Sequence, residues 1–214
     1  MATFDSILYV NRDKIDIYSG GKMVVFPFLP TFIKDLEIVD KELFKTQLFA
    51  FLDKNAITLG ASLVLLSESV CFISEPITPK ENPDEVLELF LMSLPFNNPT
   101  ARILENKVIG TNKDLYEAIN DVVAQKGVRI KTVSPAFLSK EMVGKKILDS
   151  EMIKFISSNE NIFIKAAFSF ESPLPAKFGE VGQGKKRSKR EVVLIWTFVA
   201  LLAIFAIWVL TRAF

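Results

Sequence analysis

Histidine is absent from this sequence of 214 residues, and cysteine occurs once, at Cys71. Histidine is the commonest general base and the commonest metal ligand. Its absence rules out a Ser-His-Asp or Cys-His catalytic arrangement within this chain and argues against a zinc or non-haem iron site. A single cysteine forms no internal disulfide, which fits a reducing compartment. Because Cys71 lies in an apolar run, we expect a small buried hydrophobic residue and not a nucleophile.

Phosphate-binding and targeting motifs are also missing. Neither GxxxxGK[ST] nor GxGxxG occurs, so the sequence predicts no nucleotide loop of these types and no other cofactor. Residues 1–19 contain no basic region followed by an apolar one, and they therefore predict no secretory signal.

Positive charge is concentrated in one short segment. A basic cluster consists of Lys185, Lys186, Arg187, Lys189 and Arg190. Residues 1–184 carry 20 Lys or Arg and 24 Asp or Glu, a net charge of −4, although the whole sequence carries +1. A body with this charge has no overall attraction to nucleic acid, which we do not expect as a partner.

The most apolar segment follows the basic cluster. Residues 192–210 are nineteen residues without a charge, and Thr197 is the only polar one. At 1.5 Å per residue they span roughly 28 Å, close to the ~30 Å of a bilayer core. A buried core helix would show a polar stripe, which this run lacks. We therefore predict a transmembrane helix over residues 191–211, with Trp196 and Trp208 as interfacial anchors.

The charges on either side of this helix predict its orientation. Five Lys or Arg precede it and one, Arg212, follows it. The positive-inside rule then gives a single-pass protein of the inner (plasma) membrane, with its N-terminal domain in the cytoplasm and a short C-terminus outside. The basic cluster would also suit anionic lipid headgroups.

Three regions follow from the composition. The stretch "ESPLPAKFGEVGQ", rich in Pro, Gly and small polar residues, marks a linker. We expect a folded domain over residues 1–170, a linker with the basic cluster over 171–190, and the transmembrane helix over 191–211. No internal repeat is visible.

Hydrophobic periodicity and turn signals predict the elements of the domain. We expect strands at 6–10, 14–19, 23–28, 101–111, 128–135 and 161–170, and helices at 40–55, 82–94, 112–127, 139–145 and 149–157. Asp40, Asn82 and Asn112 are the predicted N-caps. Residues 61–77 fit either two strands or one strand broken at Glu68-Ser69. Three strands followed by alternating helices and strands predict an α/β (α+β) fold with a mixed sheet and flanking helices.

This order of elements resembles the ribonuclease-H-like half-domain of the actin-like superfamily. Within that group, three stretches are similar to the PilM family of type IV pilus assembly and to the cytoplasmic domain of the GspL proteins of type II secretion. They are "SLVLLSESVCFISEPI", a helix running into "SLPFNN", and "VVAQKGVRIKTVSPAFLS". The resemblance covers roughly residues 1–165 and implies a role in a membrane assembly.

The sequence departs from these families where they bind nucleotide. PilM proteins have an Asp-x-Gly-Ser-type loop between the first two strands, whose amides hold phosphates. Here that turn reads "VNRDKID" without glycine, and we interpret Gly20-Gly21 as a hairpin turn. The sequence also lacks the second half of an actin-like ATPase, which supplies the other phosphate loop. ATP binding is therefore not implied.

We do not predict an enzyme. The acids that an active site would draw on are Asp13, Asp16, Glu68, Glu75, Glu81, Asp84, Glu85, Asp114 and Asp121. A ribonuclease-H-type nuclease needs several carboxylates that converge on two metal ions. Its first acid lies midway along the first strand, where this sequence has Leu8-Tyr9-Val10. Asp13 and Asp16 flank a turn, where we expect solvated charges, and no metal is predicted.

The resulting hypothesis is a non-catalytic, membrane-anchored docking or scaffold protein of a type IV pilus or type II secretion-like assembly. Its expected partners are the membrane and other inner-membrane assembly proteins, with a homo-oligomer as a further option. The edge strand of an open sheet, or a transmembrane face with Ala200, Ala203 and Ala206, would form the contacts. Two alternatives remain open: a nucleotide-binding actin-like regulator (a diverged ATPase half), and a tail-anchored adaptor unrelated to pili.

Overall fold

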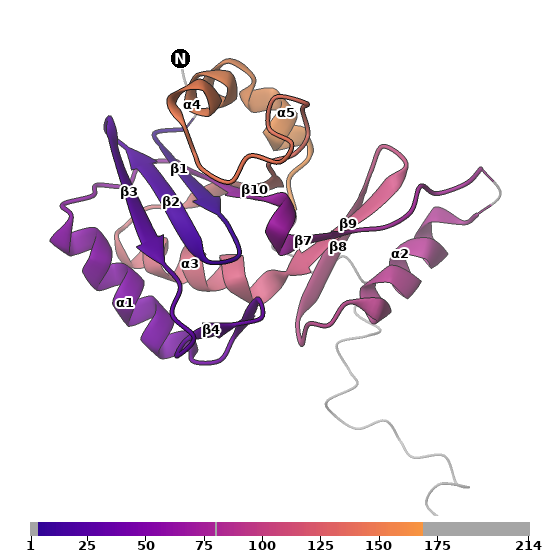
Figure 1. Cartoon of the computed structure of the whole chain (residues 1–214), viewed down its shortest axis with the longest axis horizontal. Helices are drawn as coiled ribbons and strands as arrows, with labels where there is room; N and C mark the ends of the chain where they lie inside the picture. Colours follow the sequence, from indigo (N-terminus) through magenta and orange to yellow (C-terminus); the bar gives the residue numbers. More distant parts are fainter. Residues whose placement is uncertain (1–3, 80, 169–214) are drawn as a thin grey trace, which may run out of the picture. The chain divides into compact units, whose positions relative to one another are not determined.

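A computed structural model of the protein describes residues 4–79 and 81–168, which belong to one compact unit (Figure 1). The predicted linker and transmembrane helix lie outside these residues. So do the basic cluster, from Lys185 to Arg190, and the predicted anchors Trp196 and Trp208. Within the described ranges, no helix is both long enough and apolar enough to span a bilayer.

A five-stranded mixed sheet forms the centre of the unit. Its strands are β1 (Ser6–Val10), β2 (Lys14–Ser19), β3 (Lys22–Pro27), β6 (Ser62–Leu66) and β10 (Ile130–Pro135), in the order β10-β6-β1-β2-β3. The β1–β2 and β2–β3 pairs are antiparallel, whereas β1–β6 and β6–β10 are parallel. The sheet confirms the three predicted opening strands and the mixed α/β class.

Helices cover both faces of this sheet. Figure 1 shows α1 (Lys41–Lys54) and α3 (Lys113–Gln125) on one side, and α4 (Ser150–Ser158) and α5 (Glu160–Lys165) on the other. Ile7 and Tyr9 pack with Met152 and Phe163 on the α4 and α5 side. Because every residue of β1 and β6 is buried, these strands read as continuous apolar runs and not as an alternation.

Polar caps fix where the helices begin. Asp40 accepts a hydrogen bond from the Leu43 N–H at 2.9 Å, and Asn112 accepts one from Asp114 N–H at 3.0 Å. Asn82 caps α2 (Pro83–Ser93) through Asp84 N–H at 3.2 Å. These contacts confirm the three predicted N-caps. Asp149 caps α4 in the same way, through Met152 N–H at 2.8 Å.

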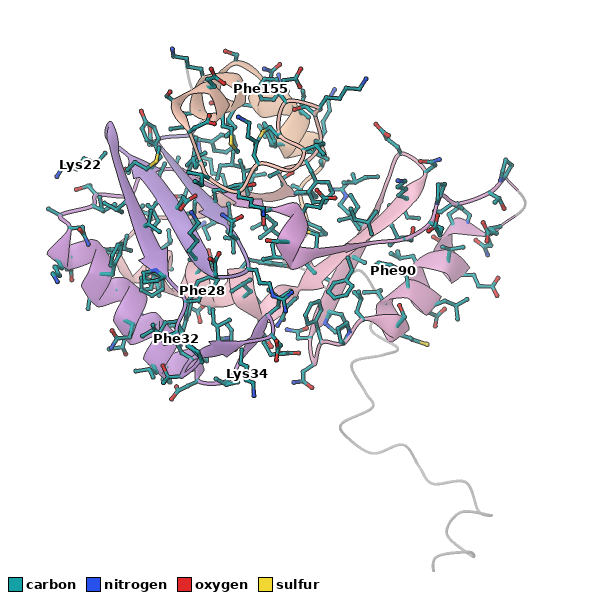
Figure 2. The ribbon with its side chains drawn as sticks, in the orientation of Figure 1. Lys22, Phe28, Phe32, Lys34, Phe90 and Phe155 are labelled. Carbon is teal, nitrogen blue, oxygen red and sulfur yellow. The ribbon has the colours of Figure 1, made fainter. Side chains whose placement is uncertain are left out.

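A small hairpin connects β3 to α1. It consists of β4 (Ile33–Lys34) and β5 (Glu37–Ile38), and its turn residues Asp35 and Leu36 both have positive φ. Leu36 is buried, and its carbonyl accepts a 3.0 Å hydrogen bond from Asn112 Nδ2. Nearby, Phe26 stacks on Phe32 with ring centroids 6.0 Å apart, and Figure 2 shows Phe32 beside α1.

A second, three-stranded sheet lies between β6 and α3 in the sequence. It contains β7 (Cys71–Ile73), β8 (Pro99–Leu104) and β9 (Lys107–Asn112), in the antiparallel order β7-β9-β8, with α2 packed against it. Residues 61–77 thus form two strands, separated by the 3₁₀ helix η1 (Glu68–Val70), and the two strands belong to different sheets.

Three predicted elements are wrong. The single strand at 101–111 is the β8–β9 hairpin, which turns at Glu105 with a positive φ of 57°. Residues 139–145 form turns instead of a helix, and the first has Met142 N–H donating to Ser139 O. Residues 161–165 belong to helix α5 and not to a strand, and the two buried residues, Phe163 and Ala166, lie three apart, the spacing of one helix face.

Candidate functional site

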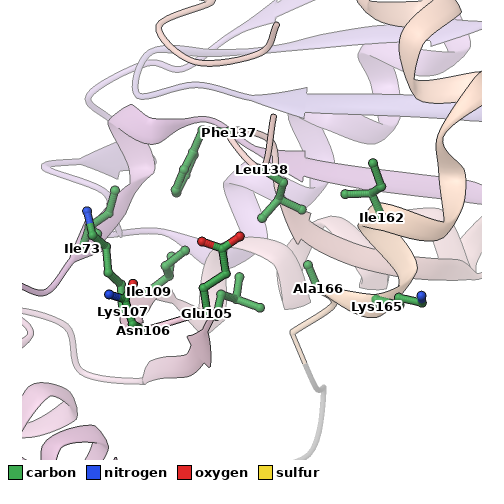
Figure 3. A pocket seen from close by; sticks show the side chains of 11 residues that line it. Ile73, Glu105, Asn106, Lys107, Ile109, Phe137, Leu138, Ile162, Lys165 and Ala166 are labelled. Atoms are coloured by element: carbon green, nitrogen blue, oxygen red, sulfur yellow. The ribbon is translucent and has the colours of Figure 1, made fainter. Parts of the chain in front are cut away.

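An apolar groove lies between the three-stranded sheet and α5 (Figure 3). Its volume is about 590 Å³, and it opens to solvent. The lining residues are Ile73, Leu104, Glu105, Asn106, Lys107, Ile109, Phe137, Leu138, Ile162, Lys165 and Ala166. We call it the hairpin groove, because the β8–β9 hairpin forms much of one wall.

Strand register explains why this wall is apolar and open. Ile73 pairs with Ile109, and Ile109 pairs with Arg102, so these three side chains share one face of the three-stranded sheet. Helix α2 covers the opposite face, where Phe90 lies close to Gly110. On the same face Phe72 meets Phe96, which follows the helix, edge-to-face at 5.4 Å. The sheet therefore has one face covered by a helix and one that lines the groove.

The other wall comes from residues after β10 and from α5. Phe137 and Leu138 follow β10, and Ile162 and Ala166 lie on or just after α5. Figure 3 shows apolar side chains from both walls around a common space. Ile73 and Ile162 are each 39% exposed, so the groove presents apolar surface that the described part of the fold leaves uncovered.

Arg102 links the two walls. Its guanidinium donates hydrogen bonds to the carbonyl of Ala167 and, at 3.2 Å, to the carbonyl of Lys165, at the end of α5. A cation at a helix C-terminus satisfies carbonyls that have no helical partner. Burial lowers the pKa of Arg102. The ordinary pKa of arginine is so high that the side chain stays charged at neutral pH all the same.

A smaller polar pocket lies where β1 and β6 end. Its volume is about 270 Å³, and it is lined by Asn11, Ser67, Glu68, Ser69, Gly144, Lys145 and Lys146. The carboxyl ends of neighbouring parallel strands are common ligand sites in α/β sheets. Ser69 Oγ accepts from Arg12 N–H at 3.2 Å and lies 2.7 Å from Ser67 Oγ. Asn11 Nδ2 is buried and has no hydrogen-bond partner among the described residues.

Asp16 corrects the expectation of a solvated charge. It lies on β2 opposite Tyr9 and its side chain is fully buried. Lys14 Nζ approaches it to 3.0 Å, and Leu148 N–H donates to it at 3.0 Å, so the loop before α4 seals the carboxylate. Burial, followed by the charge of Asp16, raises the pKa of Tyr9 to about 12, and its hydroxyl donates to the Lys145 carbonyl at 2.6 Å.

None of the remaining candidate acids is fully buried. Two are partly buried, Asp114 and Asp121. The others are exposed: Asp13, Glu68, Glu75, Glu81, Asp84 and Glu85. No group of three or more Cys, Asp or Glu side chains among the described residues is placed to hold a metal ion. Cys71 is partly buried on β7, and desolvation raises the pKa of its thiol, which keeps it protonated at neutral pH.

The predicted interaction edge corresponds to β3, the outer strand of the five-stranded sheet. Met23 and Val25 on β3 are 42% and 47% exposed. At the other edge, the N–H of Phe168 donates to Val133 of β10 at 2.7 Å, so part of that strand is paired. No local pattern in the sequence indicates the hairpin groove, because its walls come from four separate segments.

No protein-family model and no curated protein matches this sequence. Solved structures similar to the chain include the PilM-PilN type IV pilus biogenesis complex, which is 11% identical with a TM-score of 0.42. The match covers 64% of this chain and 49% of that one. Another is the cytoplasmic domain of EpsL, an inner membrane component of the type II secretion system of Vibrio cholerae. It is 15% identical over 62% of this chain and 57% of that one, with a TM-score of 0.33.

A third similar structure is a protein of unknown function with an actin-like ATPase fold from Bacteroides thetaiotaomicron. It is 14% identical over 63% of this chain and 52% of that one, with a TM-score of 0.34. The chain spans about half the length of the solved structures it matches. They include a type IV pilus biogenesis complex and a component of a type II secretion system. These TM-scores describe a partial likeness, from which neither the activity nor the partners of this chain follow.

Proposed function

We propose that this chain is a non-catalytic, membrane-anchored docking protein of a type IV pilus or type II secretion-like assembly. The observation that carries the docking role is the hairpin groove, an open apolar site of about 590 Å³. A site of this size suits a short apolar segment of a partner, since binding pockets are concave and mostly apolar. Glu105, Lys107 and Lys165 at the groove would orient that segment through its polar groups.

The finer fold assignment rests on strand order. The strand order is β3-β2-β1-β6-β10, with two antiparallel pairs on one side of β1 and two parallel pairs on the other. This arrangement supports a ribonuclease-H-like domain of the actin-like type. In this interpretation the three-stranded sheet with α2 is an insertion between β6 and α3.

The membrane anchor is the second part of the proposal, and its support is the sequence alone. The apolar run at 192–210 and the five basic residues before it support a single-pass protein of the inner membrane with its domain in the cytoplasm. Tethering would confine the groove to a thin layer and raise its effective concentration for partners in the same membrane. A reporter that is active only in the cytoplasm, fused after Phe214, should be silent, and an active reporter would contradict this topology.

Crosslinking in native membranes tests the docking role. Ile73→Glu would place a charge in the groove, and Val39→Glu is a matched control at an exposed apolar position outside both the groove and β3. We expect inner-membrane pilus or secretion components to crosslink to the wild-type chain and to the control, but not to Ile73→Glu. If no such component is recovered, the assignment to a pilus or secretion machine should be dropped in favour of an unrelated tail-anchored adaptor. Crosslinking of Ile73→Glu at the wild-type level would exclude the groove as the docking site.

A second candidate function is nucleotide binding. It is favoured by Asn11 Nδ2, which has no hydrogen-bond partner among the described residues. This buried donor lies in the same polar pocket as Lys145 and Lys146, which suits an anionic group such as a phosphate. Calorimetry of the full chain with Mg-ATP separates the two functions. Micromolar binding that is lost in Asn11→Leu would support a diverged actin-like regulator and count against a purely docking role.

A further inference from the structure

Helix α2 carries an exposed apolar pair on its outer side. Its inner side packs against the three-stranded sheet through the buried Leu91 and Leu94 and through Phe90 (Figure 2). Leu89 and Met92 are 61% and 64% exposed, more than any other large apolar side chain among the described residues. They lie three residues apart, and residues at this spacing are neighbours on a helix surface.

Two acidic residues border this pair. Glu85 precedes Leu89 by four residues and Glu88 precedes Met92 by four, so all four side chains share one face. We call it the outer α2 face. Neither glutamate forms an ion pair with a residue in the described ranges. The face therefore presents two adjacent apolar side chains next to two uncompensated negative charges.

We propose that the outer α2 face binds an amphipathic basic helix of a protein partner. Apolar residues spaced three or four apart on that helix would cover Leu89 and Met92, and Lys or Arg beside them would meet Glu85 and Glu88. This is the helix-against-apolar-face mode of recognition, with charge complementarity setting the orientation. An anionic membrane surface fits poorly, because it would repel the same two glutamates.

This surface is distinct from the hairpin groove. Helix α2 covers one face of the three-stranded sheet and the groove lies on the other, so both can be occupied at once (Figure 1). A partner on the outer α2 face would bring a second protein to the tethered domain without competing for the groove.

Methionine methyl NMR of the full chain in zwitterionic nanodiscs tests the proposal. Met92 reports on the outer α2 face, the exposed Met23 on β3 is the internal control, and Met142 and Met152 are buried. The probes are a leucine-lysine peptide of about 18 residues with leucine at helical spacing, and a leucine-glutamate peptide of the same pattern. We expect the lysine peptide to shift the Met92 signal with saturation and to leave Met23 unchanged.

Charge reversal makes the test specific. The double variant Glu85→Lys, Glu88→Lys should weaken binding of the lysine peptide by about tenfold or more and should gain binding of the glutamate peptide, because two attractive pairs become repulsive. Leu89→Ser should weaken both complexes. Equal shifts at Met23, no shift at Met92, or an affinity that charge reversal leaves unchanged would overturn the proposal. None of these outcomes depends on the groove.

Discussion

The two sheets of this protein differ in how they are covered. Every residue of β1 and β6 in the five-stranded sheet is buried, with helices on both faces. In the three-stranded sheet, Phe72 and Ile73 of β7 are each 39% exposed, and α2 covers one face only. We therefore expect a division of labour: the buried strands β1 and β6 contribute most to the stability of the unit, and the three-stranded sheet presents an open face that a partner can contact.

The largest expected effect comes from equivalent truncations in the two sheets. Leu65→Ala removes a fully buried side chain beneath α4 and should cost about 2–5 kcal/mol of unfolding free energy. Ile73→Ala in the groove should cost less than about 1.5 kcal/mol, because the side chain is already partly hydrated. Urea unfolding of the full chain in detergent, followed by circular dichroism, measures both. Equal costs would contradict the division of labour.

A smaller effect should come from overfilling the contact between α2 and its sheet. A Cβ on Gly110 would lie 2.6 Å from Leu94 Cδ1 and 2.8 Å from Phe90 Cε1. Gly110→Ala should therefore cost about 1–3 kcal/mol and speed amide hydrogen exchange in β8 and β9 more than in β1. The matched control is to make Gly110→Ala in a Leu94→Ala protein, which lacks one of the clashing atoms and should therefore lose less stability. If Gly110→Ala costs the same unfolding free energy with and without Leu94→Ala, overpacking is excluded as the cause.

The smallest effect concerns α4, which covers only the five-stranded sheet. The hydrogen bond from Met152 N–H, followed by that from Lys145, lowers the pKa of Asp149. Because the folded-state pKa is lowered, the ionised carboxylate of Asp149 stabilises the folded protein. This stabilisation is complete above the ordinary pKa of 3.8 and is lost as the pH falls through the folded-state pKa. Asp149→Ala should cost about 1 kcal/mol near pH 7. Its difference from wild type should shrink as the pH is lowered toward 3, and a constant difference would argue against this cap.

Local signals predicted much of the fold, and tertiary contacts decided the rest. Asp40, Asn82 and Asn112 could be recognised as caps because a cap needs only its own side chain and the next three residues. The β8–β9 turn was missed because its positive-φ position is Glu105, whereas a glycine there would have indicated a turn. Helix α5 was missed because "IFI" alone fits a strand equally well, and only the fold shows that Phe163 and Ala166, three residues apart, are both buried.

The candidate sites were less predictable than the fold. Asp16 was expected in solvent because it follows a turn, but residues 132 positions away close over it through Leu148 N–H. The hairpin groove depends on Ile73, Ile109, Phe137 and Ile162 coming together from distant parts of the sequence. The outer α2 face is local, but the sequence pattern did not reveal which side of this broadly apolar helix would pack inward.

The contacts of Arg102 have a mechanical consequence. This arginine belongs to the hairpin, yet it holds the carbonyls of Lys165 and Ala167, and the next residue, Phe168, donates its N–H to β10. A pull applied to the chain after Phe168 would load both sheets at once, instead of peeling α5 away from one of them. If the proposed anchor pulls on the chain at this point, the force would be shared between the two sheets before any single element unfolds.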